Sequence, residues 1–466
     1  MPAILALDLG TSGAKAALID TATGETTAVH NEPYPTHTSP DGGVEQSPED
    51  WLTAARVAIA DLPTDDVAAL SVTGQMQDLI CLDGSGAAIG RAILYNDTRA
   101  TDAATAVHAE VPGWVEVTGN EQNATSSAAM LRRLHDLDDP RAGADSVLFS
   151  PAGYLLHRLG LELVVDPTTA STTGLMDLSD RSWSPEVCAA AHCAPGALPQ
   201  IRAGHVGATA EGNALGLPAG IPVVLAPGDA ACTTLGIIGD EPGTDYLYLG
   251  SSGWCAQLRT DVQTPGPVHQ LAVDGGILQI AAVLSAAGTA DWARTAFLGG
   301  ITATEADTLL LDARAPSGLL ALPSLHGERF PVRDDNLRAA VIGMHAGTTG
   351  TDLYRAVLEG VILALLPGMA DTSAPLPVVG GGATSLPWMR ITADITGRPV
   401  QLIDDADAAL TGCALAAVTA LRLDAPGIRP LSHRPHTLID VDADAHAGYG
   451  GVAKRHRRLY DLLGSV

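Results

Sequence analysis

Short runs of apolar residues divide the first half of the chain into strands, with longer periodic segments between them. Residues 3–9, 14–20 and about 25–32 predict three consecutive strands joined by short turns. A helix is predicted from about Ser47, because the Ser-Pro-Glu-Asp run there supplies an N-cap, a proline in the first turn and early acidic residues. The other strands predicted in this half are 67–73, 77–82, 92–95 and 222–227, and the other helices are 97–110 (capped by Asp97), 124–137, 151–159 and Asp229 to about Gly236.

The second half begins with a hairpin at 245–258, and strands again alternate with helices after it. The strands expected there are 277–283, the PLPVV segment before a triple glycine and 399–403, and the helices are 286–298, 303–313, 350–370, Ser385–Thr396, 407–421 and a terminal helix around Lys454 to Arg458. This alternation predicts an α/β architecture with mixed sheets. The length of 466 residues suits two domains, and we predict 1–240 and 241–466, packed across a cleft because no low-complexity linker separates them.

One short segment occurs twice: LDLGTSG at 7–13 returns as LYLGSSG at 247–253. Each copy is a strand that runs into a turn of glycine and small hydroxyl residues, and a second strand follows each turn. A fixed internal offset indicates a duplicated domain. Glycines let backbone N–H groups close on a phosphate, and Ser or Thr hydroxyls add donors. The copies differ at Asp8, which is Tyr248 in the second, as expected for two phosphate clips of which only one carries a carboxylate.

Composition narrows the class of protein. The formal net charge of −27 predicts no nucleic-acid partner and no anionic membrane surface as partner. No apolar run approaches the ~20 residues that a membrane span requires. The chain has lysines only at Lys15 and Lys454, so binding of a polyphosphate would depend on backbone amides and a metal ion. Six cysteines without CxxC spacing are typical of reduced thiols in a cytoplasmic enzyme: Cys81, Cys188, Cys193, Cys232, Cys255 and Cys413.

The first copy of the repeat is a candidate nucleotide site. Asp8 at the strand end would hold Mg²⁺ directly or through water, while the turn approaches the terminal phosphates. The alternative is an ordinary hairpin with a capping aspartate, and the second copy favours the functional interpretation. The P-loop pattern GxxxxGK followed by Ser or Thr is absent. The turn residues concerned are Gly10, Thr11, Ser12 and Gly13 in the first copy and Gly250, Ser251 and Ser252 in the second.

Two further turns carry candidate chemistry. Gly380, Gly381, Gly382 and Ala383 join a strand to a helix, where glycines would let a base or ribose press against the backbone. Dinucleotide binding is disfavoured because the spacing is not GxGxxG; a close helix–strand contact is the structural alternative. Asp229 follows a buried strand at a helix start, and it is either an N-cap or a catalytic base that deprotonates a hydroxyl attacking a phosphoryl group.

Polar residues at the ends of the first-half strands suit a polyhydroxylated ligand, whose hydroxyls need donors and acceptors. Capping of surface turns is the alternative explanation for them. These residues are Gln75, Met76, Gln77 and Asp78, followed by Asn96, Asp97 and Arg99. Cys188, His192 and Cys193 could be imagined as metal ligands, but a fourth ligand is missing and helix packing is the favoured interpretation.

Taken together, these motifs resemble the FGGY family of carbohydrate kinases, and within it the xylulokinases, over nearly the whole chain. DLGTSGAK and LGSSG resemble its phosphate motifs, GQMQD and ILYNDTR its sugar segments, and PGDAA the loop with the catalytic aspartate. LPSLHGERFP resembles its Gly-Glu-Arg-x-Pro loop and GGGATS its adenosine motif. The most specific match is GMHAGTTGTDLYRAVLE, from Gly343 to Glu359, which fits the long C-terminal signature.

The resemblance implies two ribonuclease-H-like domains of the actin/hexokinase/Hsp70 type, an N-terminal sugar-binding one and a C-terminal adenosine-binding one, with ATP and Mg²⁺ between them. It implies phosphorylation of a terminal ketose hydroxyl, D-xylulose to D-xylulose 5-phosphate first, with ribulose, another pentulose, a tetritol or glycerol as alternatives. A small-molecule sugar is then the substrate, and a homodimer is a family-level expectation. The implied roles are catalysis by Asp229 and Asp8, metal binding by Asp8, cofactor binding by Gly10, Thr11, Ser12, Lys15, Gly250, Ser251, Ser252, Gly381, Gly382 and Ala383, and substrate binding by Gln75, Met76, Gln77, Asn96, Asp97, Arg99 and Asp229.

The chain departs from the xylulokinase pattern where substrate is chosen. Gln77 replaces a histidine, Asp78 a glycine, and Ala230 the asparagine expected after the catalytic aspartate. The Lys-Leu-x-Trp segment expected near 129–132 reads Ala-Met-Leu-Arg. A site built to hydrogen-bond a hydroxyl discriminates strongly against a ligand that lacks it, so these changes bear on which sugar is used. The rival hypotheses are an actin- or chaperone-like ATPase, indifferent to sugar, and a catalytically silent sugar sensor.

Overall fold

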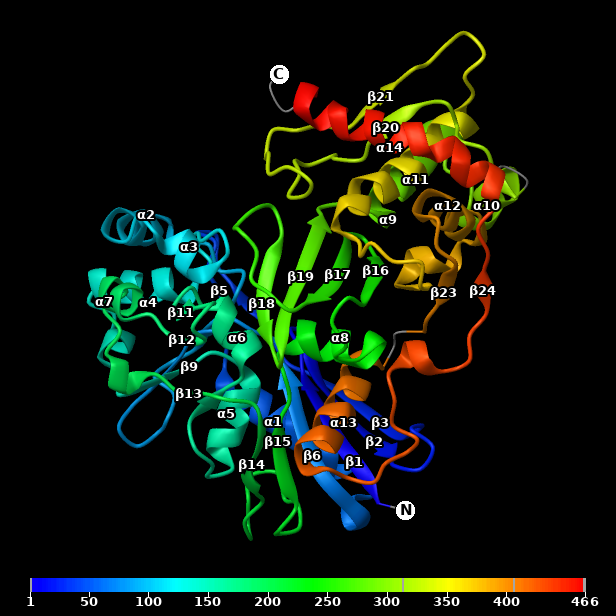
Figure 1. The fold of residues 1–466 in the computed structure, drawn as a ribbon. Coiled ribbons are helices and arrows are strands. Elements are labelled where there is room, and N and C mark those ends of the chain that lie inside the picture. The colour runs from blue at the N-terminus through cyan, green and yellow to red at the C-terminus, as the bar shows by residue number, and fades with distance from the viewer. Residues whose placement is uncertain (1, 312–313, 405–406, 464–466) are drawn as a thin grey trace.

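Two large mixed sheets form the framework of the computed structural model, which describes residues 2–311, 314–404 and 407–463. The first sheet, in spatial order, is β14 (Gly204–Ala208), β15 (Pro222–Leu225), β6 (Val67–Gly74), β1 (Ala3–Leu9), β2 (Gly13–Asp20) and β3 (Thr26–Pro33). The second is β18 (His269–Val273), β19 (Gly276–Val283), β17 (Gly253–Arg259), β16 (Asp245–Leu249), β22 (Leu376–Val379), β23 (Val400–Leu402) and β24 (Leu438–Ile439). The sheets occupy the lower and upper halves of Figure 1 and define two lobes.

The internal repeat of the sequence reappears as strand pairing. β1 runs antiparallel to β2 and parallel to β6. In the second lobe, β16 runs antiparallel to β17 and parallel to β22. Each copy of the repeat is therefore a central hairpin of its sheet, flanked on its other side by a parallel strand. Because β6 runs parallel to β1 and β22 runs parallel to β16, the turn after each of these parallel strands lies at the same edge of the sheet as the neighbouring hairpin tip.

Fourteen helices cover the sheets and connect them in the described residues. In chain order they are α1 (Pro48–Ala60), α2 (Thr101–Glu110), α3 (Trp114–Thr118), α4 (Ser127–Asp136), α5 (Pro151–Arg158), α6 (Pro167–Thr172), α7 (Pro185–Ala190), α8 (Asp229–Ile238), α9 (Ala287–Leu298), α10 (Ala303–Leu310), α11 (Gly350–Leu365), α12 (Leu386–Thr396), α13 (Ala408–Leu421) and α14 (Ala443–Leu463). Short strands complete the fold: β4 (His37–Thr38), β5 (Val44–Gln46), β7 (Ile80–Leu82), β8 (Ala92–Ile93), β9 (Ser146–Leu148), β10 (Val164–Val165), β11 (Met176–Asp177), β12 (Ser182–Trp183), β13 (Gln200–Ile201), β20 (Leu320–Leu322) and β21 (Ala340–Ile342).

Helices α8 and α13 form the link between the lobes (Figure 1). Their backbones touch, because a Cβ on Gly236 would strike the carbonyl of Ala408 and a Cβ on Gly412 would strike that of Cys232. α13 also packs on the first sheet, where Cys413 joins a buried cluster of strand residues. A helix from late in the chain is thus part of the first lobe's core.

The outer layers follow the alternating pattern of the strands. α1 and α5 cover one face of the first sheet through a cluster that contains Trp51 and Tyr154. α9, α11, α12 and α14 enclose the aliphatic core of the second lobe. A satellite group made by α2, α3, α4 and α7, on the left of Figure 1, has its own buried cluster around Trp114. None of the helices in the described residues combines the length and apolar character that crossing a bilayer requires.

Most predicted elements are present, and the differences have local causes. The helix predicted from Asp97 begins at Thr101 with no side-chain cap, so that cap was wrong: the Asp97 carboxylate instead accepts from Arg99 and from the Val44 amide. The helix predicted over 350–370 ends at Leu365, and a 3₁₀ turn containing Pro367 follows. Strand 77–82 is reduced to β7 by a positive φ at residue 77. Of the helix predicted over 303–313, α10 ends at Leu310, and residues 312–313 lie outside the described part.

Candidate active site

The tip of the first hairpin is a tight turn with donors left over. The Gly10 amide donates to the Gly13 carbonyl at 3.1 Å, and the Tyr34 hydroxyl donates to the Gly10 carbonyl. Within the described residues, the amides of Thr11 and Ser12 donate to no protein acceptor. The turn leaves N–H groups available to an anion, as a phosphate clip requires.

Asp8 lies beside this tip, directly across the hairpin from Lys15. One of its carboxylate oxygens, Oδ1, is buried and has no hydrogen-bond partner. Burial raises the pKa of Asp8 to about 6, against a smaller opposing effect of the Lys15 charge. A buried, unpartnered carboxylate oxygen is a ligand that a hard cation such as Mg²⁺ would satisfy. Lys15 itself donates to Asp407 at 2.8 Å and thereby connects the hairpin to the start of α13.

The second tip has the same character with an aromatic residue in place of the acid. The carbonyls of Gly250 and Ser251 accept from Ala287 and Ala286 at the start of α9. The ring of Tyr248 stacks on Trp254, with 3.8 Å between ring centroids. A Cβ on Gly250 would collide with this tyrosine, which explains why glycine is required there. Tyr248 therefore supports the tip by packing, without the charge that Asp8 provides.

The triple-glycine turn lies against that second tip. Gly380 has a φ of +89° and follows β22, the parallel neighbour of β16. A Cβ on Gly382 would meet Leu249 and Trp388, whereas a Cβ on Gly381 would meet open space. Gly382 is thus explained by the close approach of strand and helix, which was the structural alternative for this motif. Gly381 needs another explanation, and its open face is available to a flat group.

Asp229 begins α8 in a loop held from several sides. Its Oδ1 accepts from the Ala230 amide at 2.7 Å, and the preceding Gly228 amide donates to Asp166 at 2.9 Å. A Cβ on Gly228 would strike the Met76 side chain, so the PGDAA loop and the predicted sugar segment are in contact. The pKa of Asp229 is raised to about 7, first by desolvation and then by the charge of Asp8. The two acids are close enough to interact electrostatically.

Gln46 and Asp166, which the sequence did not single out, connect the glycine tip, the sugar segment and the loop of Asp229. The Gln46 amide nitrogen donates to the Thr11 carbonyl at 2.8 Å, and its oxygen accepts from Gln75 at 2.9 Å. Trp51 also donates to this oxygen. Gln46 is fully buried and links the first tip to the sugar segment. Gln46 could not have been found from the sequence, because no pattern marks a single glutamine before a helix cap. Asp166 could have been noticed, because an Asp followed by Pro is an N-cap signature.

Two models of one family match the chain: the N-terminal domain of the FGGY family of carbohydrate kinases over residues 3–236, and its C-terminal domain over residues 251–421. The chain belongs to the FGGY family of carbohydrate kinases. The predicted two-lobed fold of the actin/hexokinase type and the assignment as a carbohydrate kinase, a phosphotransferase, are confirmed.

Similar proteins agree with this family membership. A xylulose kinase from Streptomyces coelicolor is 30% identical over 440 residues, which cover 90% of this chain and 88% of the relative. A xylulose kinase from Escherichia coli is 30% identical over 482 residues, covering 98% and 99%. The crystal structure of a protein described as a "xyloylose kinase" from Brucella ovis matches with a TM-score of 0.87 and 27% identity over 99% of both chains.

The predicted sugar residues of this FGGY kinase fall into two groups. Gln77 and Asn96 line a cavity between the lobes, and the Gln77 amide donates to the Thr125 carbonyl at 2.6 Å. Gln75 is buried, with its side-chain oxygen unpartnered. Asp97 and Arg99 do not line this cavity, because they pair with each other at 2.6 Å and Arg99 also reaches Glu45 at 2.8 Å. Their substrate role stays a prediction.

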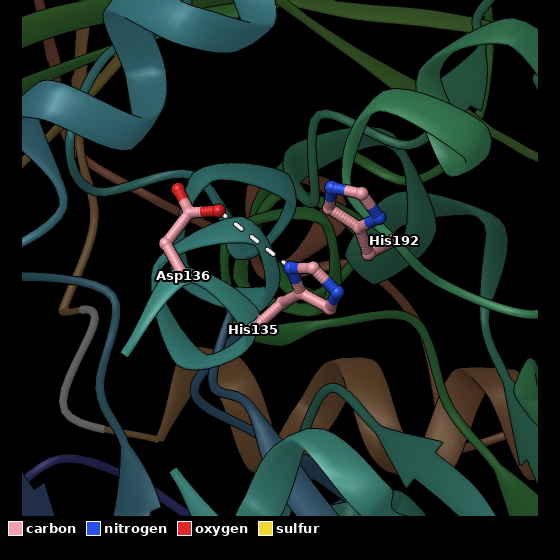
Figure 2. Close-up of side chains that lie close together, drawn as sticks. All are labelled: His135, Asp136 and His192. Carbon is pink, nitrogen blue, oxygen red and sulfur yellow. Dashed lines mark ion pairs between the residues drawn. The ribbon is translucent and has the colours of Figure 1, made fainter. Parts of the chain in front are cut away.

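A cluster of ligand-type side chains lies away from the kinase site, on α4 and in the turn that follows α7 (Figure 2). The His135 and His192 rings stack with 3.7 Å between centroids, and Asp136 lies 3.6 Å from His135. The Asp136 carboxylate already accepts from Arg132, and stacked rings direct their nitrogen lone pairs along parallel planes, away from a common point. All six cysteines are buried and unpaired, so Cys188 and Cys193 form no ligand set with the exposed His192.

Proposed function

We propose that this FGGY kinase transfers the γ-phosphoryl group of ATP to a terminal hydroxyl of a ketose, most directly the 5-hydroxyl of D-xylulose. The observation that carries the proposal is the pair Asp8 and Asp229: two carboxyl groups with raised pKa values, of which Asp8 lies beside the first glycine tip and raises the pKa of Asp229 by its charge. The xylulose kinases to which the chain is similar cover nearly its whole length and support the choice of sugar.

In this proposal Asp229 accepts the proton of the acceptor hydroxyl as its oxygen bonds to the γ-phosphorus, and the bond from that phosphorus to ADP breaks. The base must be ionised to do so, and the neighbouring charge of Asp8 opposes ionisation. A Mg²⁺ ion held by Asp8 would neutralise phosphate charge and would also lower the pKa of Asp229. The cation therefore matches both the orphaned oxygen of Asp8 and the need for an ionised base.

The remaining roles are assigned in the same proposal. The amides of Thr11 and Ser12 bind phosphate oxygens from the first lobe, assisted by Gly10 and by the charge of Lys15, while Gly250, Ser251 and Ser252 bind them from the second. Gly381, Gly382 and Ala383 receive the adenosine. Gln75, Met76, Gln77 and Asn96 receive the sugar. We further propose a cytoplasmic location, residues 1–240 and 241–466 as the two domains, and a homodimer as the assembly.

The test is ADP release over a panel of D-xylulose, D-ribulose, a hexulose, erythritol and glycerol, with Mg²⁺ present. The proposal expects D-xylulose to give the highest kcat/KM and Asp229→Asn to abolish turnover with every acceptor. A different pentulose or a polyol at the top of the panel would reassign the substrate within the same chemistry. ATP turnover that is indifferent to acceptor and survives in Asp229→Asn would refute a sugar kinase and favour the ATPase hypothesis.

A further inference from the structure

A cavity of about 400 Å³ opens between the lobes beside the predicted sugar segment. Its first-lobe wall includes Gln77, Asn96 and Glu121, and its second-lobe wall includes His269, Arg329 and Arg333. Gln77 connects the cavity to the sugar segment, since the adjacent Met76 touches the loop of Asp229. An acceptor whose reactive hydroxyl lies at Asp229 would extend its far end toward this second wall.

The second wall is cationic in a chain that carries a formal net charge of −27. Arg329 and Arg333 are both exposed, in the loop that follows β20. Several other arginines are held by carboxylates, as Arg99 is by Asp97 and Arg314 by Asp394. Among the described residues, no ion pair or side-chain hydrogen bond engages Arg329 or Arg333. Two guanidinium groups without anionic partners thus face one small cavity.

His269, at the start of β18, lines the same cavity as these arginines and Gln77. Its pKa is lowered, first by desolvation and then by the charges of Arg329 and Arg333. Both effects favour the neutral imidazole, which can donate or accept a hydrogen bond there. Glu121 is the acidic residue of the cavity lining, and it lies on the opposite lobe.

This wall is anchored to the first lobe. The Asn120 side chain donates to the Gln270 carbonyl at 2.8 Å and accepts from the Gln270 amide at 2.7 Å. Thr168 on α6 donates to the Ala272 carbonyl at 2.7 Å, and Ser171 accepts from the Ala272 amide at 3.1 Å. β18 is thereby pinned across the cleft, and His269 keeps its place relative to Gln77. The cavity is a formed feature of the fold.

We propose that Arg333, with Arg329 and His269, forms an anion subsite at the far end of the acceptor site, which binds the carboxylate of a sugar acid. A neutral ketose has no group that needs two guanidinium partners, whereas a carboxylate accepts from a guanidinium through two parallel hydrogen bonds. A cleft lined by one sign of charge also concentrates ligands of the opposite sign. The acceptor class therefore includes aldonates of the same chain length as the ketose.

This inference rests on the proposed kinase function for its chemistry. A terminal hydroxyl of the sugar acid gives its proton to Asp229, its oxygen bonds to the γ-phosphorus of ATP, and ADP leaves. The carboxylate takes no part in bond making or breaking. It adds binding at the far end, so that the acid binds more tightly than the polyol in which –CH₂OH replaces –COO⁻.

The experiment compares D-xylonate with xylitol, which differ only at that end group. Dissociation constants are measured by calorimetry on the full chain with ADP and Mg²⁺, and each compound is assayed as an acceptor and as an inhibitor of D-xylulose turnover. We expect D-xylonate to bind at least about tenfold more tightly than xylitol, to compete with D-xylulose, and to lose its advantage as salt rises. In Arg333→Gln the xylonate-to-xylitol ratio should fall toward one, and in Arg333→Lys it should be intermediate.

Arg56→Gln is the matched control, because it removes one exposed positive charge on α1, outside the cavity lining, and should keep the wild-type ratio. Thermal unfolding verifies that each variant is folded. Equal binding of D-xylonate and xylitol by the wild type, or a ratio unchanged in Arg333→Gln, would overturn the proposal. An advantage for D-xylonate that appears only in Glu121→Gln would also overturn it, by showing that Glu121 occupies the arginines. Absent D-xylulose turnover would reject the proposed function alone, because the calorimetric ratio is measured without turnover.

Discussion

The acids of the active site show how neighbouring charges set the properties of single residues. Asp8 and Asp229 both have raised pKa values, near 6 and 7, and burial is the main cause for each. Asp166 adds a smaller unfavourable charge near Asp229 while its carboxylate holds the Gly228 amide. The pKa of Asp229 in the free protein is thus brought close to neutral pH, and a general base is most effective when its pKa lies near the working pH.

The pH dependence of kcat/KM should report this tuning, because kcat/KM follows ionisation in the free protein. Below a pH of about 7 Asp229 becomes protonated and cannot accept a proton, so kcat/KM should fall about tenfold per unit in acid. Asp166→Asn keeps an oxygen for the Gly228 amide but removes a charge, so its acid limb should move to lower pH. Steady-state assays from about pH 5 to 9 measure the acid limb of the wild type and that of Asp166→Asn. An unshifted limb in Asp166→Asn would contradict the electrostatic account.

Asp229→Asn should abolish catalysis and stabilise the fold at neutral and alkaline pH. The pKa of Asp229 is raised, so the folded state binds its proton more tightly than the unfolded state does. The stability this adds is present in acid and is lost as pH rises from about 4 through about 7. An uncharged amide avoids that loss, and we expect Asp229→Asn to be more stable than wild type by at least about 1 kcal/mol at pH 8. Urea unfolding at pH 5 and pH 8 tests this, since the gap should shrink at pH 5.

At the scale of elements, the long C-terminal signature has a structural use. Glu359 on α11 is buried and accepts from the Ser317 amide and hydroxyl, from Arg355 and from Tyr449. The signature helix therefore ties the loop before β20 and helix α14 to the core of the second lobe. A family motif that matches well in sequence can thus hold the lobe together at a distance from the chemistry.

The sequence was informative about elements wherever the pattern was local. The two hairpins, the strand before Asp229 and the helix after the triple glycine follow from alternation, glycine turns and caps, and all are present. β18 was missed although the Asp274-Gly275 dipeptide that joins it to β19 is a local hairpin signal. Its contacts across the cleft with Asn120 and Thr168 could not be predicted, because these residues are distant in sequence. Gln46 was missed for the same reason, since its importance comes from contacts with Thr11 and Gln75. Fold class follows from local pattern, whereas the walls of the site depend on long-range contacts.

The α8–α13 contact gives the prediction that belongs to this scale. Gly412→Ala would place a methyl group against the Cys232 carbonyl and force the two helices apart. Overpacking of this kind costs about 1–3 kcal/mol or more, and here it also displaces Asp229 at the start of α8. We expect lower stability together with a lower kcat. Gly450→Ala on α14, where a Cβ meets open space, is the matched control: it should leave kcat unchanged and raise stability by about 0.5–1 kcal/mol, because alanine is favoured over glycine in a helix interior.

At the scale of the whole molecule, the lobes are joined by more than the two linking helices. Lys15 pairs with Asp407 at the start of α13 and so holds the first hairpin to a linking helix, whereas Asn120 hydrogen-bonds Gln270 of β18 directly across the cleft. One contact comes from the phosphate clip and the other from the acceptor wall. A movement of the lobes that separated Asn120 from Gln270 would have to break these hydrogen bonds, so the contact holds the acceptor wall in a fixed position relative to the sugar segment.

Asn120→Ala should separate acceptor binding from nucleotide binding. The substitution removes two buried hydrogen bonds to the backbone of β18 and leaves the Gln270 amide and carbonyl without these partners, at a cost of about 2–4 kcal/mol. β18 carries His269, so loosening it should raise the KM for the sugar severalfold, whereas the KM for ATP should change little because the Asn120 side chain hydrogen-bonds Thr118 and Gln270 and holds β18, not a glycine tip. Two-substrate kinetics with urea unfolding measure both effects, and Asn336→Ala, at an exposed loop position, is the control. Equal rises in both KM values would mean that the clasp positions the lobes as a whole, and that the acceptor wall has no separate support.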